Sequence, residues 1–246
     1  MRSYVCTLLA ILFCLGAAKA SAETVDLAVV FAADVSRSVD DDEFKLQRQG
    51  YAAAVTDPAV LKAIAAGPHG AIAISFIEWS GEEEQQVVAD WTVVRDGESA
   101  AGFAATLIQA PRSFAGRTSI STALDFSRAY FAKLKPAAMR RVIDVSGDGN
   151  NNAGRPILDA RNEAIAAGFT INGLAIINAH PNPGYFAHVQ PPGGLPAYYR
   201  ENVIGGPGAF LLVVQDFSTF REAITKKLVT EIAAARSFTY ASLSPR

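Results

Sequence analysis

Uninterrupted apolar runs alternate along the chain with longer segments in which apolar residues recur at helical spacing. The first run, residues 25–33 (VDLAVVFAA), is continuously apolar after Asp26, which is typical of a strand buried on both faces of a sheet. Further strands are predicted at 70–80, 85–94, 140–149, 169–177 and 209–214. Helices are predicted at 41–66, with a break near TDP, and at 98–109, 119–134, 157–167 and 217–235.

The spacing of these elements predicts an α/β fold. Only the short turn GEEE separates residues 70–80 from residues 85–94, so these two strands form a hairpin and the second is antiparallel to the rest. The other strands alternate with helices, which favours a doubly wound, mostly parallel, six-stranded Rossmann-like sheet with helices on both faces. In such sheets ligands bind beyond the carboxyl ends of the strands.

The first 22 residues have the pattern of a cleaved secretory signal peptide. Arg2 precedes an apolar run, and the small-residue sites AKA and ASA follow it. The run is shorter than the roughly 20 residues of a spanning helix, so we expect secretion across the inner membrane, to the periplasm or outside the cell, without stable membrane insertion. Lipidation at Cys14 is a less favoured alternative, since bulky Leu12 and Phe13 precede it.

The rest of the chain is predicted to be one domain, residues 23–240, followed by a tail at 241–246. Cys6 and Cys14 both lie in the signal, so the mature chain has no thiol for disulfides, catalysis or soft metals. Residues 178–208 are rich in Pro, Gly and aromatic residues and are too long for an ordinary connection. We interpret them as an ordered insertion whose aromatic side chains pack down.

Charge excludes nucleic acid as an expected partner. Removing the signal takes away Arg2 and Lys19 and no acid, so 22 basic and 24 acidic residues become 20 and 24, a net charge of −4. No basic stripe interleaved with aromatic residues is present. An anionic membrane surface is disfavoured for the same reason.

Three predicted loops carry small oxygen ligands. Asp34, Ser36 and Ser38 alternate after the first strand, so in an extended segment they point to one side. Thr118 lies between two helices, and Asp148 lies in the turn SGDGN into which the strand predicted within 140–149 runs, after VIDV. Two carboxylates and three hydroxyls suit Mg²⁺, or alternatively Mn²⁺, and disfavour zinc or copper. A carboxylate of another molecule can replace a water on such an ion.

The motifs DVSRS, GRTSI and SGDG, in this order in an alternating chain, resemble the metal-ion-dependent adhesion site (MIDAS) of von Willebrand factor A-type domains. The resemblance covers nearly all of the mature chain and matches all five metal positions. It implies a divalent ion, usually magnesium, completed by Glu or Asp of a protein partner, and strand order 3-2-1-4-5-6. Residues 198–214 and 220–232 resemble more closely a group of bacterial secreted single-domain proteins of this type.

Other polar residues near these motifs have plain structural interpretations. The acids at 40–43 sit where a helix begins and interact favourably with its dipole. The glutamates at 82–84 form the solvated tip of a hairpin, and the asparagines at 150–152 form a turn. Ser119 and Ser121 are expected to cap a helix or lie on the surface.

Arginines are expected at the rim of the site, where they would guide an acidic partner: Arg37, Arg112 and Arg117. The histidines are far apart and pair with no Ser or Cys in the sequence, which argues against a catalytic triad: His69, His180 and His188.

The favoured function is a secreted, non-enzymatic module that uses Mg²⁺ to bind an acidic side chain of a protein. One alternative is a phosphatase of the haloacid-dehalogenase-like class, because SGDGNNN is similar to a motif of that class. Its proton donor would stand at Ser36, which is no carboxylic acid. The other alternative is a structural or assembly component of the cell envelope.

Overall fold

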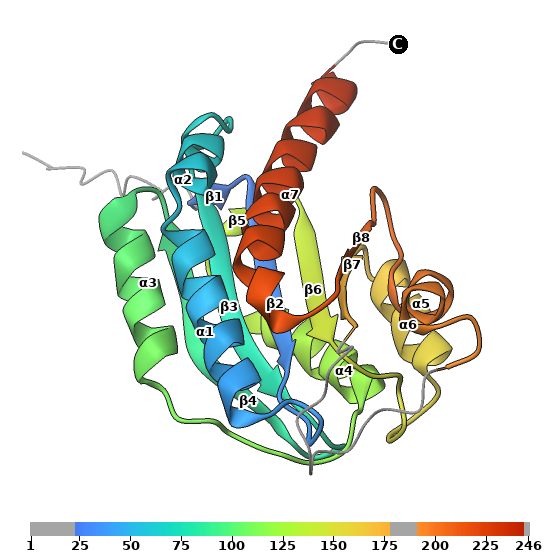
Figure 1. The fold of residues 1–246 in the computed structure, drawn as a ribbon. Helices are drawn as coiled ribbons and strands as arrows, with labels where there is room; N and C mark the ends of the chain where they lie inside the picture. Colours follow the sequence, from blue (N-terminus) through green and yellow to red (C-terminus); the bar gives the residue numbers. More distant parts are fainter. Residues whose placement is uncertain (1–22, 178–190, 244–246) are drawn as a thin grey trace, which may run out of the picture.

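The computed structural model describes residues 23–177 and 191–243. A six-stranded sheet with the order β4-β3-β2-β6-β7-β8 forms its centre (Figure 1). Numbered along the chain within this sheet, the order is 3-2-1-4-5-6, with only the β3–β4 pair antiparallel, which confirms the predicted topology. The strands are β2 (Leu27–Asp34), β3 (Ile72–Trp79), β4 (Gln85–Val94), β6 (Arg141–Gly147), β7 (Thr170–Ile176) and β8 (Leu211–Val214). The short strands β1 (Thr24–Val25) and β5 (Ala137–Ala138) pair separately.

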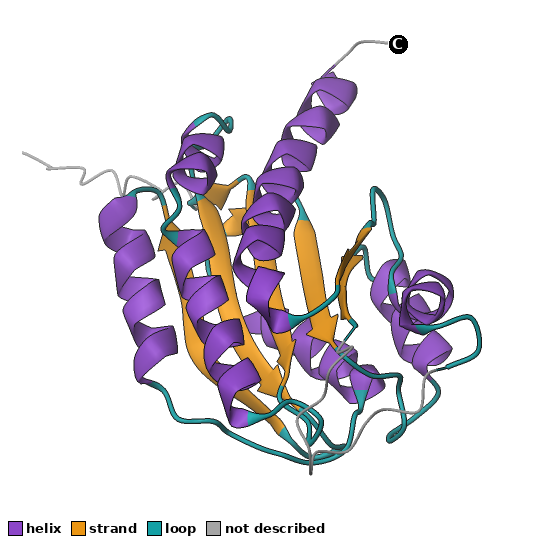
Figure 2. Cartoon of the chain, viewed as in Figure 1, coloured by secondary structure: helices purple, strands orange, loops and turns teal. Residues whose placement is uncertain are grey.

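Helices cover both faces of the sheet (Figure 2). On one face lie α1 (Asp41–Val55), α2 (Pro58–Ala65), α3 (Gly97–Gln109) and α7 (Phe220–Leu243). On the other lie α4 (Ile120–Tyr130), α5 (Ile157–Ala166) and the short α6 (Leu195–Tyr198). Strand β2 shows the alternation that divides the core, since Val29 and Phe31 pack with the first group and Val30 and Ala32 with the second.

Capping residues set the first helix boundaries where the sequence predicts them. The Asp40 carboxylate accepts hydrogen bonds from the backbone N–H groups of Asp42 and Glu43, and the Glu43 side chain accepts one from the N–H of Asp40. The acidic run therefore begins α1, as expected. The Asp57 carboxylate caps α2 by accepting the backbone N–H of Ala59, and Pro58 stands at the first helical position.

The C-terminal helix is longer than predicted. It continues to Leu243 rather than ending near Ala235, so part of the predicted tail at 241–246 is helical. No glycine or proline stands between Phe220 and Leu243 to end the helix. Of the helices within residues 23–177 and 191–243, none offers an apolar stretch long enough to span a bilayer.

Half of the predicted insertion at 178–208 packs onto the domain. Residues 178–190 lie outside the described residues, as does the predicted signal at 1–22. After α6, a π-helical turn (Tyr199–Val203) lies against α5 and β7. The backbone of Gly205 then exchanges two hydrogen bonds with Ile171 of β7, with N···O distances of 2.7 and 3.1 Å.

A buried charged cluster joins α7 to the sheet. The Lys227 ammonium lies 2.5 Å from the Asp144 carboxylate of β6 and 2.9 Å from that of Glu231, and all three side chains are at most 1% exposed. Asn172 of β7 donates to Glu231. One lysine faces two carboxylates here, so burial and the charge of Glu231 raise the pKa of Asp144 to about 7.

We expect Lys227→Met to lower the free energy of unfolding by about 3–5 kcal/mol, because it leaves two buried carboxylates without their cation. Chemical denaturation monitored by circular dichroism measures the change. The control is Lys226→Met, which alters the exposed neighbouring lysine and should stay within about 0.5 kcal/mol of wild type. Equal losses in the two variants would contradict the role of the buried cluster.

Candidate metal centre

Two neighbouring parallel strands deliver the two aspartates to one edge of the sheet. β2 and β6 pair in register up to Ala33 opposite Ser146. Asp34 is the last residue of β2, and Asp148 directly follows β6. Because parallel strands end on the same side, both carboxylates emerge together at the carboxyl edge, where ligands bind in sheets of this kind.

The five predicted ligand residues form one hydrogen-bonded chain. The backbone N–H of Ser36 donates to Asp34 Oδ1 over 2.7 Å, and the Ser36 and Ser38 hydroxyls are 3.3 Å apart. The Ser38 hydroxyl donates to Asp148 Oδ1 over 2.8 Å, and the Thr118 hydroxyl to that of Ser36 over 3.4 Å. All five residues are at most 7% exposed. The fold thus gathers them into a compact set of oxygen atoms.

Arg112 lies in the α3–α4 loop, and its side chain points at the backbone of the β2–α1 loop, not outward to a partner as the sequence suggested. Its Nη2 donates to the carbonyl oxygens of Val35, Ser36 and Val39 over 2.8, 3.0 and 2.8 Å, and its Nε donates to that of Phe114 over 2.9 Å. The guanidinium therefore ties the β2–α1 loop to the loop before α4. Sequence reasoning missed this role because the local pattern around an arginine does not show where the side chain goes.

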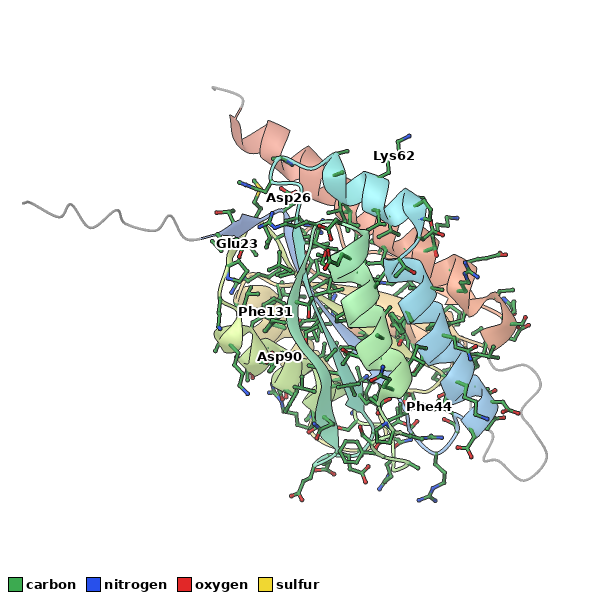
Figure 3. The ribbon with its side chains drawn as sticks, turned by 90° about the vertical axis from the view of Figure 1, so that its left-hand side faces the viewer. Glu23, Asp26, Phe44, Lys62, Asp90 and Phe131 are labelled. Atoms are coloured by element: carbon green, nitrogen blue, oxygen red, sulfur yellow. The ribbon has the colours of Figure 1, made fainter. Side chains whose placement is uncertain are left out.

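A buried ion pair fixes the start of the same α3–α4 loop. Arg48 of α1 lies 2.6 Å from Glu78 of β3, with side chains 3% and 0% exposed. Glu78 Oε2 accepts the backbone N–H of Ser113 over 2.9 Å, and Arg48 also donates to the Pro111 carbonyl. The segment that leads to Thr118 is thus held from α1, β3 and the first loop. Phe44, labelled in Figure 3, marks this end of the molecule, because its ring lies 5.5 Å from the Arg112 guanidinium.

Asn151 and Asn152 do more than form a turn. The Asn152 side-chain oxygen accepts from the backbone N–H of Thr118 over 3.0 Å, and the backbone N–H of Asn152 donates to the Thr118 carbonyl over 2.8 Å. The Asn151 side chain accepts from the N–H of Ser121 over 2.9 Å. These amides clamp the loop after β6 to the loop that carries Thr118. The position of these two asparagines directly after SGDG is the sequence signal that could have indicated this connection between the loops.

Several neighbouring residues depart from their predicted exposure. Ser119 occupies the N-cap position of α4, one of the two expected places, although its side chain makes no capping hydrogen bond. Ser119 and Ser121 are fully buried and not on the surface, and the N–H of Ser119 donates to the Ser80 carbonyl over 2.7 Å. Glu82 and Glu83 are exposed as expected, whereas Glu84 turns back to accept from the N–H of Gly81 over 2.9 Å. The hairpin turn therefore packs against the Thr118 loop and is only partly a solvated tip.

The space beside Asp34 is closed by a residue of the insertion, Tyr199. A methyl group placed on Gly147 would lie 2.8 Å from the Tyr199 hydroxyl oxygen and 2.9 Å from Asp34 Oδ2, so only glycine fits there. Tyr199 is fully buried. Burial, followed by the charges of Asp34 and Asp148, raises the pKa of its hydroxyl well above the usual value, so it stays protonated.

The chemistry of this donor set fits a hard divalent cation. Two carboxylates buried close together repel each other, and a divalent ion between them would remove that repulsion. Their companions are hydroxyls, which bind Mg²⁺ through oxygen. Among residues 23–177 and 191–243, no group of three or more His, Cys, Asp or Glu side chains is arranged to hold a metal ion. An ion here would therefore depend on hydroxyl and water ligands beside its two carboxylates.

The sequence matches one protein family over most of its length. The family model, described as "Protein of unknown function (DUF1194)", covers residues 24–236. The chain belongs to this family. A search of the curated proteins found no match.

Solved von Willebrand factor A structures share the fold of this DUF1194 protein. A von Willebrand factor type A protein from Catenulispora acidiphila has a TM-score of 0.59 at 16% identity over 84% of this chain and 43% of its own. Proximal thread matrix protein 1 of the mussel byssus, with a zinc-occupied MIDAS motif, has 0.60 at 16% over 87% and 49%. The pilus adhesin SpaC of Lactobacillus rhamnosus GG has 0.60 at 11% over 85% and 31%.

The TM-scores of these structures establish the fold, which is that of von Willebrand factor A domains, as the resemblance in the sequence implied. The chain spans less than half the length of each of the three structures.

We expect Arg112→Lys to lower the free energy of unfolding by about 1–3 kcal/mol, since a single ammonium cannot serve carbonyl groups of both loops. Urea denaturation in metal-free buffer measures this loss. Arg37→Lys is the matched control, because Arg37 lies in the β2–α1 loop that Arg112 contacts and has an exposed side chain. An Arg112→Lys variant as stable as the Arg37→Lys variant would refute the bridging role.

Proposed function

We propose that this protein is a secreted, metal-dependent protein-binding module of the adhesion type. Asp34, Ser36, Ser38, Thr118 and Asp148 would hold Mg²⁺, with Mn²⁺ as the alternative ion. An Asp or Glu side chain of a protein partner would complete the coordination. The observation that carries the proposal is the hydrogen-bonded, all-oxygen cluster at the carboxyl edge of the sheet.

The residues of the site would have two different roles, charge balance and neutral coordination. Asp34 and Asp148 supply two negative charges, which balance a divalent ion. The hydroxyls of Ser36, Ser38 and Thr118 are neutral, so they fill coordination positions without further reducing the attraction of the ion for an anion. The bound metal supplies that attraction, and the partner carboxylate is selected because it is a hard, charged oxygen ligand.

The surface beside the site bears charges of both signs. A shallow hollow of about 510 Å³ is lined by Arg37 and Arg117, by the glutamates at 82–84, and by small residues of the adjoining loops. Arg37 is exposed there, which supports the expected attraction of an acidic partner. The glutamates would favour basic groups next to that carboxylate, so the partner epitope would be mixed in charge.

The phosphatase alternative is weaker on its own chemistry. A proton donor would stand two residues after Asp34, where Ser36 instead directs its backbone N–H to the Asp34 carboxylate. The buried lysine, Lys227, is engaged by Asp144 and Glu231. We therefore expect no hydrolysis of a general aryl phosphate in the presence of Mg²⁺. Turnover that disappears in Asp34→Ala would favour the phosphatase.

A structural or envelope-assembly role is the remaining alternative. Such a component would keep its contacts after chelation of metal, whereas the proposed module would lose them. The predicted signal at 1–22 places either function in the periplasm or outside the cell.

We expect Mg²⁺ to stabilise the wild-type protein by about 2.7 kcal/mol when its concentration reaches about 100 times its Kd. Asp34→Ala should abolish this gain, since one of the two anionic ligands is lost. Asp42→Ala, an exposed acid of the same stretch, should retain it. Thermal denaturation with and without EDTA, repeated with Mn²⁺ and Zn²⁺, measures the effect. No metal-dependent shift in the wild type would count against the metal site.

The partner test uses the same variants as bait. Protein captured from a native envelope fraction with Mg²⁺ should be released by EDTA, missed by Asp34→Ala and retained by Asp42→Ala. Replacing the contacting Asp or Glu of the captured protein with Asn or Gln should then abolish binding. Capture that persists through chelation would support the assembly alternative.

A further inference from the structure

The insertion reaches the space beside Asp34 of the candidate metal centre through Tyr199. Tyr199 begins the π-helical turn that lies against α5 and β7, and its side chain is fully buried. Two sets of backbone hydrogen bonds hold this turn. The N–H of Ile204 donates to the Tyr199 carbonyl over 2.9 Å within the turn, and Gly205, directly after it, pairs with Ile171 of β7. The ring is therefore held in place by the fold.

The Tyr199 hydroxyl ends beside the Asp34 carboxylate. Both groups border the space that Gly147 leaves open. A methyl group placed on Gly147 would lie 2.8 Å from the Tyr199 hydroxyl oxygen and 2.9 Å from Asp34 Oδ2. Within the part of the chain that the structure describes, the Tyr199 hydroxyl oxygen has no hydrogen-bond partner. A buried hydroxyl without a hydrogen-bond partner costs free energy, and a nearby carboxylate oxygen is a suitable acceptor for it.

The neighbouring Tyr198 connects the same turn to the loop after β6. Its hydroxyl accepts a hydrogen bond from the backbone N–H of Asn151 over 3.2 Å. Asn151 in turn holds the N–H of Ser121 at the start of α4. The insertion thus approaches the site at two places, beside the Asp34 carboxylate and at the backbone of the loop after β6.

We propose that Tyr199 is a positioning residue of the metal centre, whose hydroxyl donates to the Asp34 carboxylate when the metal is bound and so couples metal binding to the packing of the insertion. This inference rests on the proposed function. Hydrogen bonds to metal-binding carboxylates orient them and raise metal affinity. Coupling is reciprocal, so the metal should also hold the turn at 199–205 more firmly.

The first experiment removes the hydroxyl and keeps the ring. Tyr199→Phe should weaken Mg²⁺ binding by about 10-fold, at the low end of the range for such outer partners. Isothermal titration with Mg²⁺ measures the affinity. The matched control is Tyr51→Phe, which removes another fully buried hydroxyl, one that donates to Ser146 from the opposite face of the sheet. It should leave the Mg²⁺ affinity within about two-fold of wild type, since it is not aimed at the ligands.

The second experiment follows the backbone amides of the turn. Hydrogen exchange of the wild-type protein should show slower exchange of the Ile204 and Gly205 amides with Mg²⁺ than with EDTA, and Tyr199→Phe should reduce that difference. If wild type binds Mg²⁺ and Tyr199→Phe binds it equally well, or if Tyr51→Phe is weakened just as much, the inference is overturned and the proposed function stands. If wild type binds no Mg²⁺, the proposed function itself fails and the inference with it.

Discussion

Parallel pairing of β2 with both of its neighbours is the constraint on which the candidate site depends. The pairs run in register from Leu27 opposite Ile72 to Asp34 opposite Trp79, and on the other side to Ala33 opposite Ser146. All three strands therefore end at one edge. Their loops must meet there, which brings Ser38 and Asp148 into contact across 110 residues of sequence. A slip of one residue in either pairing would turn Asp34 to the other face of the sheet.

Side chains, rather than regular secondary structure, hold those loops in position. A loop has no ladder to satisfy its carbonyl and N–H groups, so each buried group needs another partner. Arg112 supplies donors to the first loop, Arg48 and Glu78 secure the start of the second, and Asn152 joins the second to the third. Each of these residues fixes a ligand-bearing segment in advance. The hydroxyls and carboxylates are thus held close to one another by the packing of the three loops.

Both faces of the sheet contribute polar groups beneath or beside this edge. On the α7 face, Lys227 and its two carboxylates bind the last helix to β6. On the other face, the insertion brings Tyr199 against the space beside Asp34. The insertion therefore belongs to the architecture of the site, although it lies far from the ligand motifs in sequence. A minimal domain without it would leave this side of Asp34 open.

The sequence by itself determined the order of the sheet strands and main helices and the single antiparallel pair, because apolar periodicity and turn length are local properties. The grouping of the five oxygen-bearing residues followed from that order and from the resemblance of three short motifs to a known site. The sequence also placed Asp40 correctly, since a helix cap acts within one turn. Only the tertiary structure decided that Arg112 faces carbonyl groups, that Ser119 is buried and that Tyr199 stands beside Asp34. Each of these facts depends on which distant segment packs against the residue, and contact across the fold leaves no periodic trace in the chain.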